Sequence, residues 1–244
     1  MCAVIVVTLA LSADYLTKYI PFRYEQAMFE GRSTIVPEPH EFDQRLKPLA
    51  ERIAHAMDLP DDMKITVHYG DVDEVNAYAT FGGHVVINRG LIEKLPNENA
   101  LAMVMAHEFA HIKHRHPIRS VGRVAVVLLA VMAVAGIQGN EVAGTLAGDA
   151  GTLTLLSFSR GQESEADRSA LEAVAGVYGH VAGALDLYEV LLEEKKKRHF
   201  DAPAFLSTHP LTEARIETLR AIQYEKGWDD SPPVTPLVGM VVQP

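Results

Sequence analysis

Two histidines and a glutamate in the stretch His107-Glu108-Phe109-Ala110-His111 have the types and the spacing of a metal site. On a helix with 3.6 residues per turn, residues four apart lie on one face, so His107 and His111 can direct two imidazole nitrogens at one point. Glu108 projects beside that point. Catalytic zinc uses two or three such nitrogen ligands, a further protein ligand from elsewhere and a carboxylate near its water. The pattern therefore predicts a hydrolytic zinc site that needs a third ligand.

A helix from about residue 97 to 114 must position these side chains. Pro96 precedes a polar, acidic start, and apolar residues at helical spacing follow it. A solvated polar helix face is the competing explanation, but the flanking run from Ala100 to Ala106 is apolar and would place the three groups near a core. A buried imidazole or carboxylate without a partner costs on the order of a few kcal/mol, and a metal ion is a natural partner.

The nearest histidines are poor candidates for the third ligand. His114 and His116 follow His111 closely, but neither continues its face of the helix. His114 is also too close along the same helix to bind a metal ion from another side. We therefore interpret both as surface histidines.

The later stretch Ser159–Asp167 is a better source of the third ligand. Glu163 and Asp167 are again four residues apart and share a helix face, so one can bind metal while the other orients a ligand histidine. Arg160 lies one turn before Glu163 and could screen these acids. A solvated helix start, where acidic residues are common, is the alternative explanation.

Composition limits the classes of partner and site. The 244 residues suffice for one large domain with a real core, and the net charge of -10 argues against nucleic acid as a partner. Cys2 is the only cysteine, which excludes an internal disulfide and a cysteine zinc site. Any metal must therefore use histidine and carboxylate ligands.

Periodicity indicates a mainly helical α+β fold. Helices are expected near residues 39–57, 97–114, 159–177, 181–198 and 211–226, and strands near 64–69, 76–81 and 84–88. Gly82-Gly83 marks a turn between the last two strands, and residues 202–208 are expected to form a loop. Residues 229–244 hold four prolines and are expected to be extended. The chain thus divides into residues 1–32, a domain of residues 33–228 and a tail of residues 229–244.

Two apolar stretches raise the question of a membrane. Residues 2–13 and 124–137 are both shorter than the ~20 residues that span a bilayer. Two interpretations of the first stretch stay open: a truncated membrane anchor, or a buried N-terminal strand or helix. The second stretch is a buried helix, a re-entrant or lipid-facing hairpin, or a lid over the site.

Three motifs in order give the chain a family resemblance. His107–His111, Ser159–Asp167 and Ser207-Thr208-His209-Pro210 followed by Arg215 resemble the zinc peptidases typified by HtpX and the CAAX prenyl proteases. Asn76-Ala77 ahead of the glycine turn fits the same pattern. The resemblance runs from about residue 21 to residue 219 and covers most of the chain.

The resemblance implies a gluzincin-like catalytic domain, with a small antiparallel sheet packed beside the HExxH helix. It implies that His107, His111 and Glu163 bind one zinc ion and that Glu108 is the catalytic base. Asp167 is then an outer partner of the metal ligands.

The resemblance also assigns residues beyond the metal. It implies that His209 stabilises the oxyanion and that Arg215 supports the same region. The strand that begins at Asn76 could bind an extended peptide by strand addition. The residues expected to bind the peptide are Asn76, Ala77, Tyr78 and Ala79.

These implications together predict a zinc-dependent endopeptidase that hydrolyses protein substrates in quality control. The short stretch 124–137 differs from the full spanning helices of the membrane-embedded relatives. It favours a soluble or single-anchored enzyme, associated with the membrane of a bacterial cell envelope, that acts on misfolded or membrane-associated proteins. The alternative is a latent, chaperone-like binding module in which His209 closes the metal site as a fourth ligand.

Overall fold

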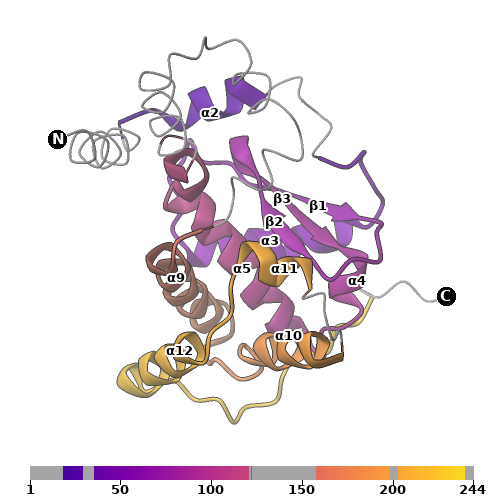
Figure 1. Ribbon diagram of the computed structural model, residues 1–244, viewed down its shortest axis with the longest axis vertical. Coiled ribbons are helices and arrows are strands. Elements are labelled where there is room, and N and C mark those ends of the chain that lie inside the picture. The colour runs from indigo at the N-terminus through magenta and orange to yellow at the C-terminus, as the bar shows by residue number, and fades with distance from the viewer. Residues whose placement is uncertain (1–18, 30–35, 121, 123–157, 198–202, 240–244) are drawn as a thin grey trace, which may run out of the picture.

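The structure, a computed structural model, describes residues 19–29, 36–120, 122, 158–197 and 203–239 (Figure 1). Its helices are α2 (Phe22–Phe29), α3 (Asp43–Ala56), α4 (Arg89–Ile92), α5 (Glu98–Lys113), α9 (Arg160–Tyr178), α10 (Asp186–Lys197), α11 (Ala204–Thr208) and α12 (Glu213–Lys226). Its strands are β1 (Thr66–Gly70), β2 (Ala77–Ala79) and β3 (His84–Asn88), with the 3-10 turn η1 (Phe81–Gly83) between β2 and β3. The mainly helical α+β prediction is confirmed.

The apolar segments 2–13 and 124–137 lie outside the described residues. Among the residues that the structure describes, no helix combines the length and the apolar character that a bilayer span requires.

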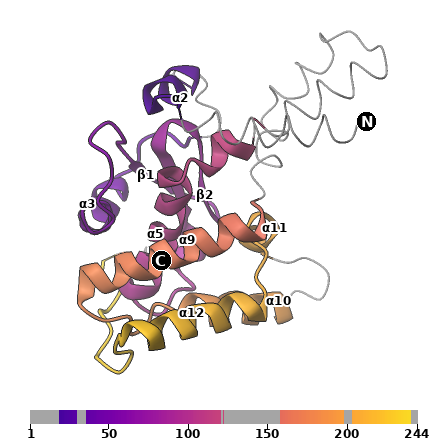
Figure 2. The same ribbon diagram turned by 90° about the vertical axis from the view of Figure 1, so that its left-hand side faces the viewer.

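Helix α5 lies at the centre of the molecule, and every residue from Asn99 to Ile112 is buried. It packs against α9, α3 and α10 and against strands β2 and β3 (Figure 1). A helix that is apolar almost all round is stable only inside a core, and this explains why it is enclosed. In Figure 2, α9 and α12 lie side by side, while α2 lies at the opposite end of the molecule.

The sheet is small and mixed. Its strand order is β1-β3-β2, with β2 antiparallel and β1 parallel to β3. The expected antiparallel arrangement is therefore correct for β2 and β3 and wrong for β1. The tight turn η1 forces its two strands to be antiparallel, whereas the longer connection after β1 lets β2 pass to the far edge of β3.

Local signals explain why three helices begin close to the predicted positions. The Asn97 side chain accepts a hydrogen bond from the N–H of Ala100 and caps α5. Ser159 and Gln162 form a reciprocal capping box at the start of α9. Thr212 caps α12 in the same way as Asn97 caps α5.

One segment differs from the sequence prediction, and a second makes contacts that the sequence did not indicate. Residues 204–208 form helix α11 where a loop was expected, and buried Phe205 anchors it. Residues 229–239, part of the expected extended tail, contain no helix or strand and lie against the domain. There, Glu98 N–H donates to the Thr235 carbonyl at 2.9 Å, and Thr235 N–H donates to Asn99 Oδ1 at 2.9 Å. This strap thus contacts the first turn of the central helix.

Gly83 should be indispensable for the turn η1. Its φ is +90°, and a Cβ added there would lie 2.2 Å from the Lys64 carbonyl oxygen. We expect Gly83→Ala to destabilise the protein by roughly 2 kcal/mol or more, measured as a lower midpoint of thermal unfolding. The control is Gly161→Ala in the first turn of α9, where the nearest atom is Ser159 Oγ at 4.0 Å. An equal midpoint for Gly83→Ala and the unaltered protein would contradict the prediction.

Candidate metal centre

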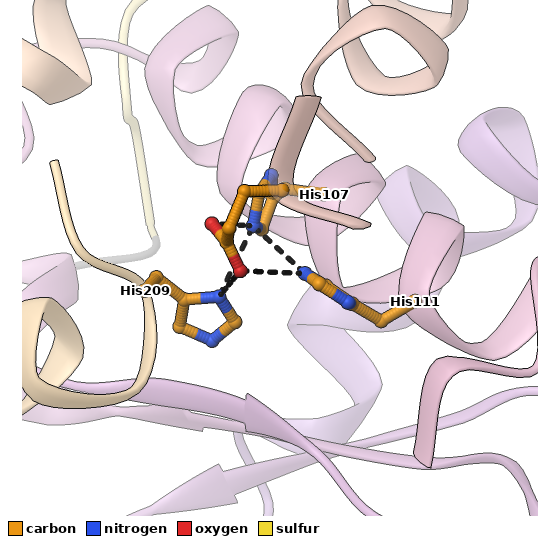
Figure 3. Close-up of side chains that lie close together, drawn as sticks. His107, His111 and His209 are labelled. Carbon is orange, nitrogen blue, oxygen red and sulfur yellow. Dashed lines mark hydrogen bonds and ion pairs between the residues drawn. The ribbon is translucent and has the colours of Figure 1, made fainter. Parts of the chain in front are cut away.

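Four buried side chains from three helical segments converge on one region. His107 and His111 come from α5, Glu163 from α9, and His209 from the C-terminal end of α11. Their ligand atoms all lie within 4.8 Å of one another. Figure 3 shows the three imidazole rings directed toward a common region. The first motif and the two later motifs, which are distant in sequence, thus meet in space.

The facing nitrogens of this cluster suit a cation better than a hydrogen-bond network. His107 Nε2 lies 3.0 Å from His111 Nε2 and 3.2 Å from His209 Nδ1. One ring nitrogen carries at most one proton, so His107 Nε2 cannot donate to both neighbours. Lone pairs directed at a shared cation remove this conflict, and three nitrogens with one carboxylate oxygen match the ligands and the number that zinc prefers.

The charge balance of the site points the same way. Glu108, Glu163 and Asp167 are buried carboxylates, and Arg215 is the cation that contacts two of them. In the state that binds a metal the imidazoles are neutral, and three negative charges with one positive charge then leave two negative charges in a region of low dielectric constant. A divalent cation balances them, which is the usual condition for burying such groups. The residues present therefore fit a zinc ion.

Glu163 and Asp167 face different partners. Glu163 Oε1 lies 3.0 Å from His209 Nδ1 and 3.5 Å from His111 Nε2. Asp167 Oδ1 lies 3.1 Å from His107 Nδ1, on the opposite side of that ring from the cluster. The sequence alone left open which acid would face the metal. In the structure, Glu163 is in the cluster, and Asp167 is placed to orient His107.

Arg215 and Tyr188 hold Asp167 in place. The Arg215 guanidinium contacts both carboxylate oxygens of Asp167 at 2.7 Å, and the Tyr188 hydroxyl donates to Oδ1 at 2.8 Å. Arg215 also lies 2.7 Å from Glu163 Oε2. Sequence reasoning missed Tyr188, because an aromatic residue at an apolar position of α10 looks like ordinary core.

Electrostatics keep both carboxylates ionised. Burial alone would raise the pKa of Asp167, but Arg215 and His107 outweigh it and hold that pKa at about 2. Burial also opposes ionisation of Glu163, yet His209 and His107 hold its pKa well below the usual range. The same two carboxylates act on His107, whose pKa rises to about 10 although burial alone would lower it.

Glu108 is fully buried beside the cluster. Its Oε2 accepts a hydrogen bond from the N–H of Ala79 at 2.8 Å, so strand β2 fixes the carboxylate. Its Oε1 has no hydrogen-bond partner among the described residues and lies 3.5 Å from His209 Nε2. Burial raises the pKa of Glu108. A carboxylate whose pKa is raised in this way holds a proton more readily, as a general base requires.

Strand β2 is at the edge of the sheet, next to this site. The Asn76 carbonyl and the Thr80 N–H bond to β3. Because hydrogen bonds alternate along an antiparallel pair, the peptide groups of Ala77 and Ala79 face the other edge, where the described residues place no further strand. The bond from Ala79 to Glu108 lies on this edge. The Tyr78 side chain is partly exposed.

Arg160 lies one turn before Glu163, as expected, but it does not pair with the acids that it could screen. It is exposed at the start of α9, and the structure has no ion pair between it and Glu163 or Asp167. Arg215 of α12 screens these acids instead. Arg160 lines a cavity of about 290 Å³ between α9 and α12, on whose wall the two acids and Arg215 also lie.

The interpretation of His116 as a surface residue is wrong. Its side chain is fully buried, and its Nδ1 lies 2.9 Å from His111 Nδ1. Burial lowers the pKa of His116 to about 4, although Glu165 acts in the opposite direction. His114 is partly exposed, with Nε2 2.8 Å from Ser169 Oγ. Helical extrapolation failed for His116 because the chain leaves the helix after Lys113.

Known proteins similar to this chain are peptidases. Residues 40–223 match peptidase family M48. The Beta-barrel assembly-enhancing protease of Escherichia coli (strain K12) is 30% identical over 213 residues, which are 81% of this chain and 42% of that protein. The Mitochondrial metalloendopeptidase OMA1 of Schizosaccharomyces pombe is 28% identical over 210 residues, 86% of this chain and 61% of that protein.

A third relative, the Protease HtpX homolog of Methylibium petroleiphilum, is 30% identical over 187 residues, 62% of this chain and 65% of that protein. The chain thus spans less than half the length of the Escherichia coli relative. The family match covers more than half of the chain and includes all three motifs, and it confirms the resemblance drawn from those motifs. On this match, the chain belongs to peptidase family M48.

Proposed function

We propose that this domain is a zinc-dependent endopeptidase that cleaves protein substrates. The observation that carries the proposal is the convergence of buried His107, His111 and Glu163 beside the Glu108 carboxylate. Two relatives that are named protease and metalloendopeptidase support it.

His107, His111 and Glu163 would hold the zinc ion, which when bound supplies a Lewis acid and a water activated for attack at neutral pH. Glu108 is the general base. Ala79 engages Oε2, so Oε1 is the oxygen that accepts a proton from water and later delivers it to the leaving amine.

Asp167 and Arg215 do not bind the metal themselves but contact the residues that would bind it. Asp167 Oδ1 lies 3.1 Å from His107 Nδ1, where it can stabilise a proton on that nitrogen and leave the Nε2 lone pair of the ring for the metal. Arg215 keeps Asp167 ionised and in place through two 2.7 Å contacts. It also neutralises part of the Glu163 charge.

The position of His209 is compatible with two roles, that of an oxyanion donor and that of a fourth metal ligand. Its Nδ1 lies within the ligand cluster, at 3.0 Å from Glu163 Oε1. Its Nε2 lies 3.5 Å from Glu108 Oε1, beside the oxygen that accepts the proton. In the proposed peptidase, His209 donates to the oxyanion that develops on the scissile carbonyl. Its place in the cluster favours, as a second candidate, a latent binding module in which His209 is the fourth ligand.

The free edge of β2 supports a proposal for substrate binding. An extended peptide can pair with the peptide group of Ala77 and the carbonyl of Ala79, because Glu108 already binds the Ala79 N–H. Such pairing uses hydrogen bonds to the peptide backbone and depends little on the side chains of the substrate. This suits an enzyme that accepts many misfolded or membrane-associated proteins. We further propose a quality-control role at a bacterial cell-envelope membrane, in line with the name of the Escherichia coli relative, a protease that enhances β-barrel assembly.

Glu108→Gln tests the general base. The amide oxygen can still accept the Ala79 N–H, so the fold and the metal ligands should be unaffected. We expect casein cleavage to fall by at least ~100-fold while zinc stays at one ion per chain, measured by metal analysis. Removing zinc with a chelator should abolish cleavage in the unaltered protein, and added zinc should restore it.

Glu172→Gln is the matched control for that substitution. Glu172 lies on the exposed face of α9, 4.0 Å from Lys226, and its variant should cleave casein at the normal rate. Undiminished cleavage by Glu108→Gln would refute the proposed mechanism.

His209→Ala separates the two roles of this histidine. As an oxyanion donor, its loss should lower kcat by ~10²–10³-fold with little change in KM or zinc content. The measurement is cleavage of a fluorogenic peptide together with zinc affinity, with exposed His55→Ala as the control. Weaker zinc binding with undiminished or increased turnover would instead identify His209 as the closing fourth ligand.

A further inference from the structure

His116 ends a chain of side chains that begins at the metal cluster. His111 Nε2 faces the cluster, and His111 Nδ1 lies 2.9 Å from His116 Nδ1. His116 Nε2 in turn lies 3.1 Å from Glu165 Oε2. His116 is fully buried, so both of its ring nitrogens are engaged by protein atoms and neither is open to water.

The contact between His116 and His111 depends on Arg115, whose backbone is in the left-handed conformation. Helix α5 ends at Lys113, and Arg115 has a φ of +60°, after which residues 116–120 are helical again. On an uninterrupted helix, a residue five positions after His111 would lie about 140° round the axis and could not touch it. The turn brings His116 back onto His111. Arg115 is held in this conformation by the buried carboxylate of Glu25 on α2 and by the Ile20 carbonyl.

Only one arrangement of protons satisfies every atom in this chain. A carboxylate cannot donate, so the His116 Nε2 that faces Glu165 carries the proton. His116 Nδ1 is then an acceptor, and it receives the proton on His111 Nδ1. This leaves His111 Nε2 with a lone pair that faces the cluster. In the reversed arrangement, the proton of each ring would be on the other nitrogen. A lone pair of His116 would then face Glu165, and an N–H of His111 would point at the metal position.

We propose that His116, backed by Glu165, is a positioning residue that holds His111 in the tautomer that binds the metal. The inference rests on the metal site of the proposed function. Asp167 does this for His107 directly, as a carboxylate. For His111, the carboxylate acts through an intervening imidazole, and the two ligand histidines of α5 are thus oriented from two different sides. Loss of such an outer partner typically weakens metal binding 10- to 100-fold.

The test measures zinc affinity by competition with a chelating dye. In His116→Phe, the ring contacts with Phe158 are retained but no acceptor remains for His111. Its zinc dissociation constant should rise about 10- to 100-fold. His116→Asn places an amide oxygen near the former Nδ1 and should restore most of the affinity. Because Glu165 is exposed, Glu165→Ala will fold and should show a smaller loss in the same direction.

His114→Leu is the matched control. His114 also contacts Glu165, at 3.4 Å, but touches none of the proposed ligands, so its zinc affinity should equal that of the unaltered protein. In the zinc-loaded protein, nitrogen-15 spectra of histidine should show the proton of His111 on Nδ1, and His116→Phe should alter that signal. Thermal unfolding of each metal-free variant separates loss of folding from loss of metal binding.

The outcomes distinguish this inference from the proposed function. If the unaltered protein binds no zinc, the proposed function itself fails. If it binds zinc and cleaves casein, but Glu165→Ala and a folded His116→Phe bind zinc equally well, only the role of His116 is overturned. An equal loss of affinity in His114→Leu would also overturn it.

Discussion

The constraint on which the structure depends is the burial of ionisable side chains in the middle of an apolar helix. Helix α5 is enclosed from Asn99 to Ile112, and Glu108 and both motif histidines are buried with it. Taking such groups out of water is costly unless each finds a partner. The surrounding elements supply those partners, and this requirement explains much of how they are arranged.

Several elements around α5 bring compensating groups. Strand β2 gives a backbone N–H to Glu108, and α9 brings two carboxylates to the imidazoles. Helix α12 then brings Arg215 against those carboxylates, and α10 adds the Tyr188 hydroxyl. Such a network is stable as a set, because removing one member leaves another buried charge unpaired. The net negative charge that remains is what suits the site to a divalent cation.

The rigid packing of these elements also has a chemical consequence. The proposed ligands lie on helices α5 and α9, whose side chains are fixed by core contacts, and buried His209 follows the end of α11. Asp167 lies 3.1 Å from His107 Nδ1 and is proposed to fix the orientation of that ring. The edge of β2 lies next to this rigid centre, so a bound peptide would meet the proposed general base already in place.

The amino-acid sequence alone was enough to predict the centre of this site. The spacing of His107 and His111 on an apolar helix, and of Glu163 and Asp167 on a later one, depends only on helical periodicity, which is a local property. The caps at Asn97 and Ser159 are local as well, and the helices that they start begin where expected. The family of the chain followed from three such local motifs.

Only the tertiary structure decided how distant groups pair. It placed Glu163 within the ligand cluster and Asp167 on the far side of the His107 ring. It also placed Arg215, rather than the nearby Arg160, against these two acids. It also placed β1 parallel to β3, and it returned His116 to His111 through one left-handed residue. These outcomes depend on packing between segments far apart in sequence and on a break in helical periodicity. A pattern read along one helix contains neither kind of information.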